Sequence, residues 1–302
     1  MRVLGFGDNI VDRFLDRGID YPGGNCVNVA VFACRLGAEA GYLGVFGSDE
    51  GGAFLRDAIA AEGVDVSRSV VREGESGVST LHVERGERTF LGWNGGGVTV
   101  RLPLVLDASL LEYVSGFDLV HSSVYSRSEP ELPKLEAGTA LISYDLSSED
   151  EFRTPEYLDR VCPSVDLVLL SCSHESEQAT RELLAQAIAR GASVALATRG
   201  TDGAVVTDGS VTVSAGAKLV DDASTIVDTM GCGDAFVAGF VMSLLGSGWR
   251  RGVPPGRAQL AAALEAGADA AHAQCFVEGA FGRGRPSDRF VAASMWGVEA
   301  HG

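Results

Sequence analysis

The sequence predicts an α/β fold with a doubly wound, mostly parallel sheet and a small antiparallel β flap. Short apolar runs rich in β-branched residues alternate along the chain with segments that have a helical pattern. Most of these runs lack strict apolar–polar alternation, which is typical of strands buried on both faces of a parallel sheet. With 302 residues, 46% of them hydrophobic, the chain is long enough to build one domain over residues 1–302.

The predicted elements follow one another in the order that a doubly wound sheet requires. The strands are Arg2–Phe6, Gly41–Phe46, Asp118–His121, Ala140–Tyr144, Asp166–Leu170 and Ser193–Thr198. The helices are Cys26–Leu36, Gly52–Glu62, Glu175–Arg190, Ala235–Leu245 and Ala258–Ala273. Helices that alternate with strands in this way cover both faces of the sheet.

One region departs from this rhythm. Residues Gly77–Val83 alternate apolar and polar side chains, and Arg88–Trp93 follow after the turn sequence E-R-G-E. Such alternation is typical of antiparallel strands with one face in water. Together with Arg13–Ile19 these segments are expected to form a flap inserted in the main domain, its strands lying within about residues 13–22 and 76–98. The alternative is an ordinary hairpin at the edge of the main sheet.

The acidic composition argues for small-molecule ligands. Lys and Arg total 24 against 41 Asp and Glu, a net charge of −17 that repels nucleic acid and anionic membranes. The two lysines, Lys134 and Lys218, follow no glycine-rich loop, which excludes a P-loop and a lysine-dependent protein-kinase site. The N-terminus lacks the apolar core of a signal peptide and no later run has transmembrane length, so the cytoplasm is the expected compartment.

The stretch G-C-G-D at residues 231–234 runs directly into an apolar helix. The first N–H groups of a helix have no internal partner, and glycines let the backbone approach a ligand closely. Gly231, Cys232 and Gly233 are therefore expected to direct N–H groups at a developing negative charge, as phosphoryl transfer requires. Asp234 would lie beside that charge as a general base. The alternative is that Asp234 caps the helix and the glycines make a turn.

A second group of polar residues follows the first strand. Asp8, Asn9 and Asp12 fall where a parallel sheet exposes its carboxyl ends, which is where ligands bind in open α/β folds. Ile10 occupies the place of the third glycine of a dinucleotide-binding loop, which argues against that site. Carboxylates and amides suit the vicinal hydroxyls of a sugar.

Two motifs in the correct order resemble the signatures of the PfkB, or ribokinase-like, carbohydrate kinases. D-T-M-G-C-G-D at residues 228–234 is similar to the family's D-T-x-G-A-G-D, and G-G-N-C-V-N at 23–28 is similar to its G-G-x-x-x-N. The resemblance implies that Asp234 is the catalytic base and that the backbone of Gly231, Cys232 and Gly233 forms the anion hole. It also implies that the sugar binds at the residues Asp12, Asn28 and Gly24, with Asp8, Asn9 and Asn25 as further candidates.

Two of these matches carry an alternative or a departure. Asn25 could instead cap the helix that it precedes. Cys232 stands where the family usually has Ala; the backbone donor survives this change, and a thiol at a helix N-terminus can be unusually reactive, so sensitivity to oxidation or alkylation is a hypothesis.

The resemblance extends to a nucleotide site. Thr198, Gly200 and Gly203 match a T-x-G-x-x-G turn that lies along the ATP phosphates and ribose, and Arg199 would add positive charge there. Glu177 matches the Glu of an N-x-x-E motif that acts near magnesium, although His174 stands at the Asn position. A plain hairpin and a solvated first helical turn are the respective alternatives.

Within the family, the stretches G-D-N-I-V-D and D-L-V-H-S-S-V-Y look most like the fructoselysine 6-kinase branch. The resemblance implies a Mg²⁺-assisted transfer of the ATP γ-phosphoryl group to a hydroxyl, expected to be primary, of a sugar or sugar–amine adduct. A monovalent cation and a homodimer that pairs through the flap are further implied. Ribokinase, fructokinase and nucleoside kinase are alternatives, and a non-catalytic sugar or nucleotide sensor is an alternative of another class.

Overall fold

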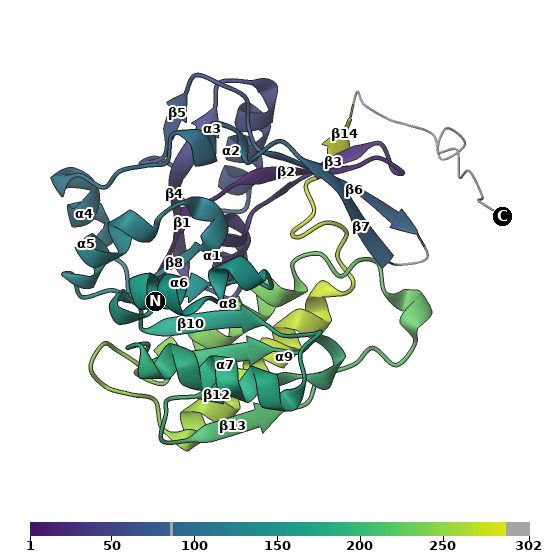
Figure 1. Ribbon diagram of the computed structural model, residues 1–302. Coiled ribbons are helices and arrows are strands. Elements are labelled where there is room, and N and C mark those ends of the chain that lie inside the picture. Colours follow the sequence, from purple (N-terminus) through teal and green to yellow (C-terminus); the bar gives the residue numbers. More distant parts are fainter. Residues whose placement is uncertain (85–86, 288–302) are drawn as a thin grey trace.

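The chain folds into a large β-sheet that runs through the body of the molecule and a smaller sheet that projects from one side of it (Figure 1). The structure is a computed structural model that describes residues 1–84 and 87–287. Its nine-stranded sheet has the order β13-β12-β11-β10-β9-β8-β1-β4-β5, and its five-stranded sheet has the order β14-β3-β2-β6-β7.

The large sheet is parallel except at one edge. All pairs from β5 to β11 run parallel, whereas β11–β12 and β12–β13 are antiparallel. The prediction of a mostly parallel α/β sheet is confirmed, and each of the six predicted strands is present. The strands are β1 Arg2–Gly7, β4 Glu39–Gly47, β5 Val70–Arg72, β8 Leu119–Ser123, β9 Leu141–Asp145, β10 Leu167–Ser171, β11 Val194–Thr198, β12 Ala204–Thr207 and β13 Thr212–Ala215.

Helices cover both faces of this sheet. Because successive side chains of a strand point to opposite faces, Val3 of β1 lies in the buried cluster that contains Phe240 of α8, whereas Leu4 lies in a second cluster that contains Leu158 of α6 and Leu184 of α7. The predicted helices are all present, and four short ones between residues 97 and 161 were not predicted. The helices are α1 Asn25–Arg35, α2 Glu50–Ala61, α3 Gly97–Arg101, α4 Ala108–Val114, α5 Leu132–Glu136, α6 Pro155–Val161, α7 Glu177–Ala189, α8 Cys232–Gly246 and α9 Arg257–Gln274.

The predicted flap is a separate sheet, here called the lid, so the edge-hairpin alternative is wrong. Its strands are β2 Ile10–Phe14, β3 Ile19–Gly23, β6 Val78–Glu84, β7 Glu87–Trp93 and β14 Arg285–Pro286. The pairs are antiparallel except β2–β6, which is parallel. The predicted segment Arg13–Ile19 is centred on the turn between β2 and β3, with the two strands on either side.

The lid is attached to the start of α8. Phe14, Tyr21 and Leu81 form a small buried cluster on one face of the lid, and Met230, just before α8, packs against it. Arg17, in the turn between β2 and β3, pairs with Glu278 at 2.9 Å. Its guanidinium also lies 3.7 Å from the carboxylate of Asp228. The lid thus reaches the loop that leads into α8 by both apolar and charged contacts.

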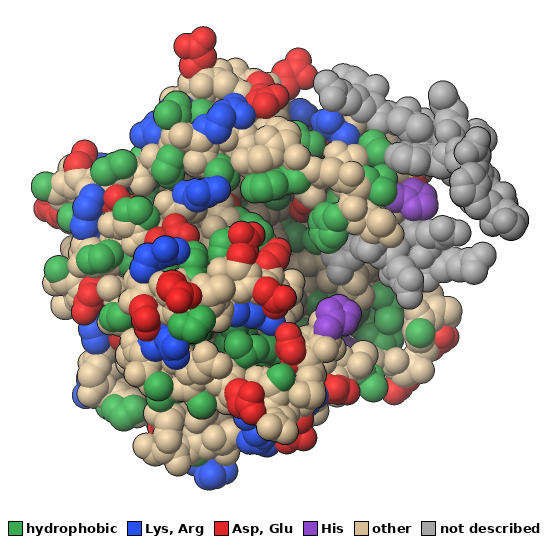
Figure 2. All heavy atoms as spheres, viewed as in Figure 1, with side chains coloured by type: hydrophobic (Ala, Val, Ile, Leu, Met, Phe, Trp, Pro, Cys, Tyr) green, Lys and Arg blue, Asp and Glu red, His purple; other side chains and the backbone are tan. Residues whose placement is uncertain are grey.

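Acidic side chains are spread over the face of the molecule seen in Figure 2, with Lys and Arg between them. This distribution agrees with the net charge of −17. Within the described residues, no helix is long and apolar enough to cross a membrane.

The two longest helices, α8 and α9, approach each other through glycines. Gly239 of α8 faces the carbonyl of Ala266, and a Cβ added at Gly239 would lie 2.5 Å from that oxygen. A Cβ at Gly267 of α9 would likewise lie 2.9 Å from Phe236. Because α8 is buried on nearly all sides, its position is set by this close contact.

We therefore expect Gly239→Ala to destabilise the protein by about 1–3 kcal/mol, because the added methyl group overpacks the α8–α9 contact. Urea unfolding at constant pH measures this loss. The matched control is Gly246→Ala at the last residue of α8, where the nearest atom to a new Cβ is Met1 Sδ at 3.9 Å. Equal unfolding midpoints for the two variants would contradict the prediction.

Candidate active site

Four carboxylates gather where the carboxyl ends of β1 and β9 meet the first turns of α1 and α8. Asp8 follows β1, Asp145 ends β9 and Asp234 is the third residue of α8. Asp12 lies on β2 of the lid. This is the edge at which the sequence predicted a ligand site, and the fold brings Asp8, Asp12 and Asp234 close enough to influence one another's charge.

Two asparagines of α1 bind these carboxylates. The side-chain amide of Asn28 donates to Asp234 Oδ2 at 2.7 Å, and that of Asn25 donates to Asp145 Oδ2 at 2.9 Å. The N-cap residue of α8 is Gly231 and that of α1 is Gly24, so neither Asp234 nor Asn25 occupies a cap position. The capping alternatives for Asp234 and Asn25 are therefore wrong.

The pKa of Asp234 is raised well above that of an ordinary aspartate. Burial is the largest cause, and the negative charges of Asp145, Asp8 and Asp12 add to it, while the Asn28 hydrogen bond opposes them. Burial, with the charges of Asp8 and Glu149, also raises the pKa of Asp145 to about 6. Both carboxyls therefore bind a proton more readily than usual, which suits a group that accepts one from a substrate.

The carboxamide oxygen of Asn28 is a buried acceptor with no hydrogen-bond partner within residues 1–84 and 87–287. The nitrogen of the same group is bound to Asp234, which fixes the orientation of the side chain. An unpaired buried acceptor is costly. A ligand hydroxyl could satisfy it from a position close to the Asp234 carboxylate.

Asp8 is held by thiol and hydroxyl donors from below the site. Its Oδ1 accepts from Cys26 at 2.9 Å and from Ser123 and Ser126 at 2.8 Å each. This network leaves Asp8 buried and fixed at the end of β1.

The other residues that were predicted to bind the sugar differ in the direction of their side chains. Asn9 directs its amide into the protein, where it donates to Tyr42 Oη at 2.7 Å and to the carbonyl of Val45 at 2.8 Å. Asp12 lies against the backbone of β3. Gly24 has φ of 112°, and a Cβ there would come within 2.8 Å of Asn9 Cα, so only glycine fits this approach.

The loop before α8 presents main-chain donors. Gly231 adopts the left-handed conformation with φ of 75°, and Gly233 faces open space. Within the described part of the chain, no backbone carbonyl accepts from the N–H of Gly231 or Gly233, whereas the N–H of Cys232 donates weakly to Thr229 O at 3.3 Å. Two of the three predicted donors thus have no backbone acceptor among the described residues.

Asp228, the first residue of the motif, shapes this loop. Its carboxylate accepts from the N–H groups of Met230 at 3.0 Å and Gly279 at 3.1 Å. It is buried, so its part in the motif is to hold the loop in place.

The predicted nucleotide turn follows β11. Gly200 and Gly203 have φ of 57° and 90°, and a Cβ at Gly203 would overlap Ala215 O. Thr198 ends the strand, half-buried. The Nε atom of Arg199 is buried without a partner among the described residues, although its Nη2 lies 3.3 Å from Asp202.

Glu177 lies in the first turn of α7, where its carboxylate pairs with Arg181 at 2.8 Å and is largely exposed. The described residues contain no group of three or more His, Cys, Asp or Glu side chains arranged to hold a metal ion. A single carboxylate such as that of Glu177 fits the way in which Mg²⁺ usually binds in kinases, through substrate phosphates and one or two carboxylates.

Sequence reasoning missed an apolar surface along α9. Leu219, Ile226, Val227 and Phe276 are each at least 37% exposed. The segment that carries the first three runs along α9, since Lys218 O accepts from His272 and Val227 N donates to Cys275 O. No motif marks these residues, and only their exposure in the folded chain identifies them.

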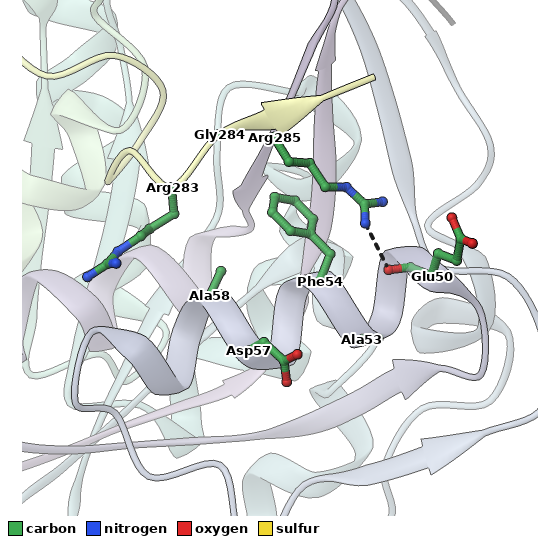
Figure 3. Close-up of a pocket in the computed structure, with 8 residues that line it drawn as sticks. All are labelled: Glu50, Ala53, Phe54, Asp57, Ala58, Arg283, Gly284 and Arg285. Carbon is green, nitrogen blue, oxygen red and sulfur yellow. Dashed lines mark hydrogen bonds between the residues drawn. The ribbon is translucent and has the colours of Figure 1, made fainter. Parts of the chain in front are cut away.

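A separate surface pocket lies between α2 and β14 (Figure 3). Arg285 lies 4.3 Å from the centre of the Phe54 ring and donates to Glu50 O at 3.3 Å. None of the residues predicted for the site lines this pocket.

Comparison with known proteins identifies the class to which this fold and site belong. The pfkB family carbohydrate kinase profile matches residues 17–283, and the chain belongs to that family. The chain adopts the ribokinase-like fold: a fructokinase with bound ATP from Xylella fastidiosa superposes with a TM-score of 0.74 at 19% identity, covering 93% of this chain and 94% of the other.

Sequence relatives narrow the class. The chain is 37% identical over 287 residues to fructosamine kinase FrlD of Bacillus subtilis (strain 168), covering 95% of each protein. It is 30% identical over 247 residues to fructoselysine 6-kinase of Escherichia coli (strain K12), covering 82% of this chain and 88% of the relative. The chain is an ATP-dependent sugar kinase, a phosphotransferase that acts on a sugar hydroxyl. The family and the branch that the motifs indicated are confirmed, and the non-catalytic sensor is set aside.

Proposed function

We propose that this kinase phosphorylates a fructosamine, the sugar part of a sugar–amine adduct such as fructoselysine, on a primary hydroxyl. The observation that carries the proposal is the Asn28–Asp234 hydrogen bond beside the unpaired oxygen of Asn28, which offers a hydroxyl an acceptor and a base together. The names of the relatives at 37% and 30% identity support the adduct as acceptor. Fructokinase is the alternative favoured by relatives of that name, one of them 30% identical over 274 residues.

In this proposal the sugar lies between α1 and the lid. Asp12 and Asn28 bind its hydroxyls, and Gly24 lets it approach the backbone. Three further residues position this site without contacting the sugar, because their side chains already bind other side chains of the protein. Asp8 binds Ser123, Asn9 binds Tyr42 and Asn25 binds Asp145. The lid excludes water that would otherwise accept the phosphoryl group.

Asp234 acts as the base in the transfer step. Its ionised carboxylate takes the proton of the attacking hydroxyl, whose oxygen bonds to the γ-phosphorus as the bond to the β-phosphate oxygen breaks. The N–H groups of Gly231 and Gly233 stabilise the charge on the moving group, and the Cys232 N–H joins them when it leaves Thr229 O.

ATP is proposed to bind at the same edge of the large sheet as the sugar, but beside the turn that follows β11. Thr198, Gly200 and Gly203 contact the phosphates and ribose. Arg199 supplies positive charge, and its unpaired buried Nε provides a donor that is already desolvated. The exposed apolar surface on and beside α9 offers a face for the adenine ring.

Mg²⁺ and a monovalent cation complete the proposed cofactors. Bound Mg²⁺ would neutralise charge on the ATP phosphates, with Glu177 as the nearby carboxylate after release from Arg181. A potassium-bound fructokinase from Vibrio cholerae shares this fold with a TM-score of 0.68 at 23% identity, which supports testing K⁺. The cytoplasm is the proposed compartment, because it supplies ATP and keeps the six cysteines of the chain reduced.

We expect Asp234→Asn to lower kcat by about 10²- to 10⁴-fold while ATP still binds, because the amide keeps the shape of the site but accepts no proton. Steady-state ADP release and calorimetric titration with ATP measure the two effects. The control is Asp269→Asn, which removes an exposed carboxylate of α9 paired with Lys218.

The pH profile adds a second readout to this prediction. Because the pKa of Asp234 is raised by burial and neighbouring carboxylates, the base becomes protonated at a higher pH than an ordinary aspartate. The rate should therefore fall as the pH is lowered through that raised pKa, and remain full above it. A wild-type rate for Asp234→Asn would refute the assignment.

The acceptor is tested by a panel of glycated lysine, fructose, ribose and adenosine. We expect glycated lysine to give a kcat/KM at least about tenfold above the others, since a site built around the adduct gains binding energy from its amine part. The same preparation and ATP concentration serve all four compounds. A preference for fructose would favour the fructokinase alternative, and one for adenosine the nucleoside-kinase alternative.

We further propose that two copies of the chain pair through their lids. Strand β7 is at the edge of the lid sheet and carries the exposed side chains Phe90, Leu91 and Trp93, at 63%, 43% and 56% exposure. An exposed apolar edge strand is prone to pair with another chain.

Sedimentation equilibrium is expected to give a dimer for the natural sequence and a monomer for Leu91→Asp. Leu102→Asp is the control, because Leu102 is 52% exposed outside the lid. A monomeric natural protein at micromolar concentration would overturn the proposal.

A further inference from the structure

Two thiols face each other at the start of the helix that carries Asp234. Cys232 is the first residue of α8 and Cys275 is the C-cap residue of α9, and their sulfur atoms lie 3.7 Å apart. Both side chains are partly exposed. They are 43 residues apart in the sequence, so only the packing of α8 on α9 brings them together.

The remaining cysteines are placed differently. Cys26, Cys162 and Cys172 are buried, and burial raises the pKa of each of these thiols. Cys34 is partly exposed, and its thiol donates to Glu62 O at 3.4 Å. Cys34 therefore serves as a matched control for general thiol reactivity.

We propose that Cys232 and Cys275 are a modification site, at which a reversible disulfide forms and switches off phosphoryl transfer. The N-terminus of α8 carries the positive end of the helix dipole, which favours the thiolate of Cys232 as the attacking group. A disulfide has an S–S distance of about 2.05 Å, so the two sulfurs need to approach by roughly 1.7 Å. The partial exposure of both residues leaves them accessible to an oxidant.

The chemistry balances with a peroxide as oxidant. The Cys232 thiolate attacks one peroxide oxygen, which gives a sulfenic acid and releases water after protonation. The Cys275 sulfur then attacks the sulfenic sulfur, the S–O bond breaks and a second water leaves. Two thiols lose two protons and two electrons in total, and a dithiol reductant returns them.

The effect on activity follows from the hydrogen bonds that the backbone of Cys275 already makes to the loop before α8. Its carbonyl accepts from Val227 N at 2.9 Å and Asp228 N at 3.3 Å, so α9 anchors the start of the loop at residues 227–232. A disulfide would tie the end of the same loop to the same residue. The Cys232 N–H and its two glycine neighbours would then move relative to Asp234, and displacements of about 1 Å at such sites can cost 10²-fold in rate.

The bond itself is tested without any assay of activity. The purified protein is treated with diamide, a diazene that takes up the same two protons and two electrons, and remaining thiols are alkylated. Digestion without reductant and mass spectrometry are expected to give a cross-linked peptide that joins Cys232 to Cys275. Its absence would overturn the inference.

The consequence is tested on the kinase, and this part rests on the proposed function. We expect diamide to lower the activity of the natural protein about tenfold or more, with recovery in dithiothreitol. Cys34→Ser should respond as the natural protein does. Cys275→Ser should keep most of its own untreated activity, because its Cys232 has lost the facing thiol.

Three results would overturn the switch. They are a cross-link with unchanged activity, equal loss of activity in Cys275→Ser, and protection by Cys34→Ser. Circular dichroism shows whether Cys275→Ser is folded. The cross-link experiment uses the natural protein and does not depend on this variant. If no acceptor is phosphorylated even in the presence of reductant, the proposed function is refuted. The mass-spectrometric result then still shows whether the disulfide forms.

Discussion

The hydrogen bond between Asn28 and Asp234 joins the two helices on which the site depends. Asn28 lies in the first turns of α1 and Asp234 in the first turn of α8, and the bond of 2.7 Å spans 206 residues of sequence. The N-cap residue of each helix is a glycine, Gly24 for α1 and Gly231 for α8, which leaves room for chain and ligand at the helix N-termini. The bond orients the carboxylate and at the same time leaves the Asn28 oxygen to a substrate.

This arrangement places like charges together at some cost in stability. Asp234 is half-buried near Asp145, Asp8 and Asp12, and each of these charges disfavours its ionised form. The chain partly offsets the cost with amide donors, since Asn28 binds Asp234 and Asn25 binds Asp145. A protein selected only for stability would not keep such a cluster, which is why it marks the functional edge of the sheet.

The loop before α8 links this cluster to the lid and to α9. Asp228 holds the loop through the N–H groups of Met230 and Gly279, and Met230 packs against the apolar face of the lid. Arg17 of the lid pairs with Glu278, beside the same loop. Movement of the lid and changes at the end of α9 therefore act on the same few main-chain donors.

Much of the fold could be predicted because it depends on local patterns. Six strands of the large sheet (β1, β4, β8, β9, β10 and β11) and the long helices α1, α2, α7, α8 and α9 have clear apolar patterns and were predicted within a few residues, whereas the short edge strands β5 and β13 were not predicted. The short helices α3 to α6 were missed, because five to seven residues carry too little periodic signal to separate them from loops. The lid strand β2 was placed too late, since the turn at residues 15–18 has no Asn-Gly or Asp-Gly pair to mark it.

The same division applies to the site and to the protein as a whole. The sequence by itself determined the fold class, the family and the candidate base, because glycines, asparagines and aspartates at fixed short spacings are properties of one segment of chain. Only the tertiary structure decided that Asn28 meets Asp234, that Asn25 meets Asp145 and that Cys232 faces Cys275. Contacts between distant segments depend on how helices pack on a sheet to within an ångström, and no single segment carries that information.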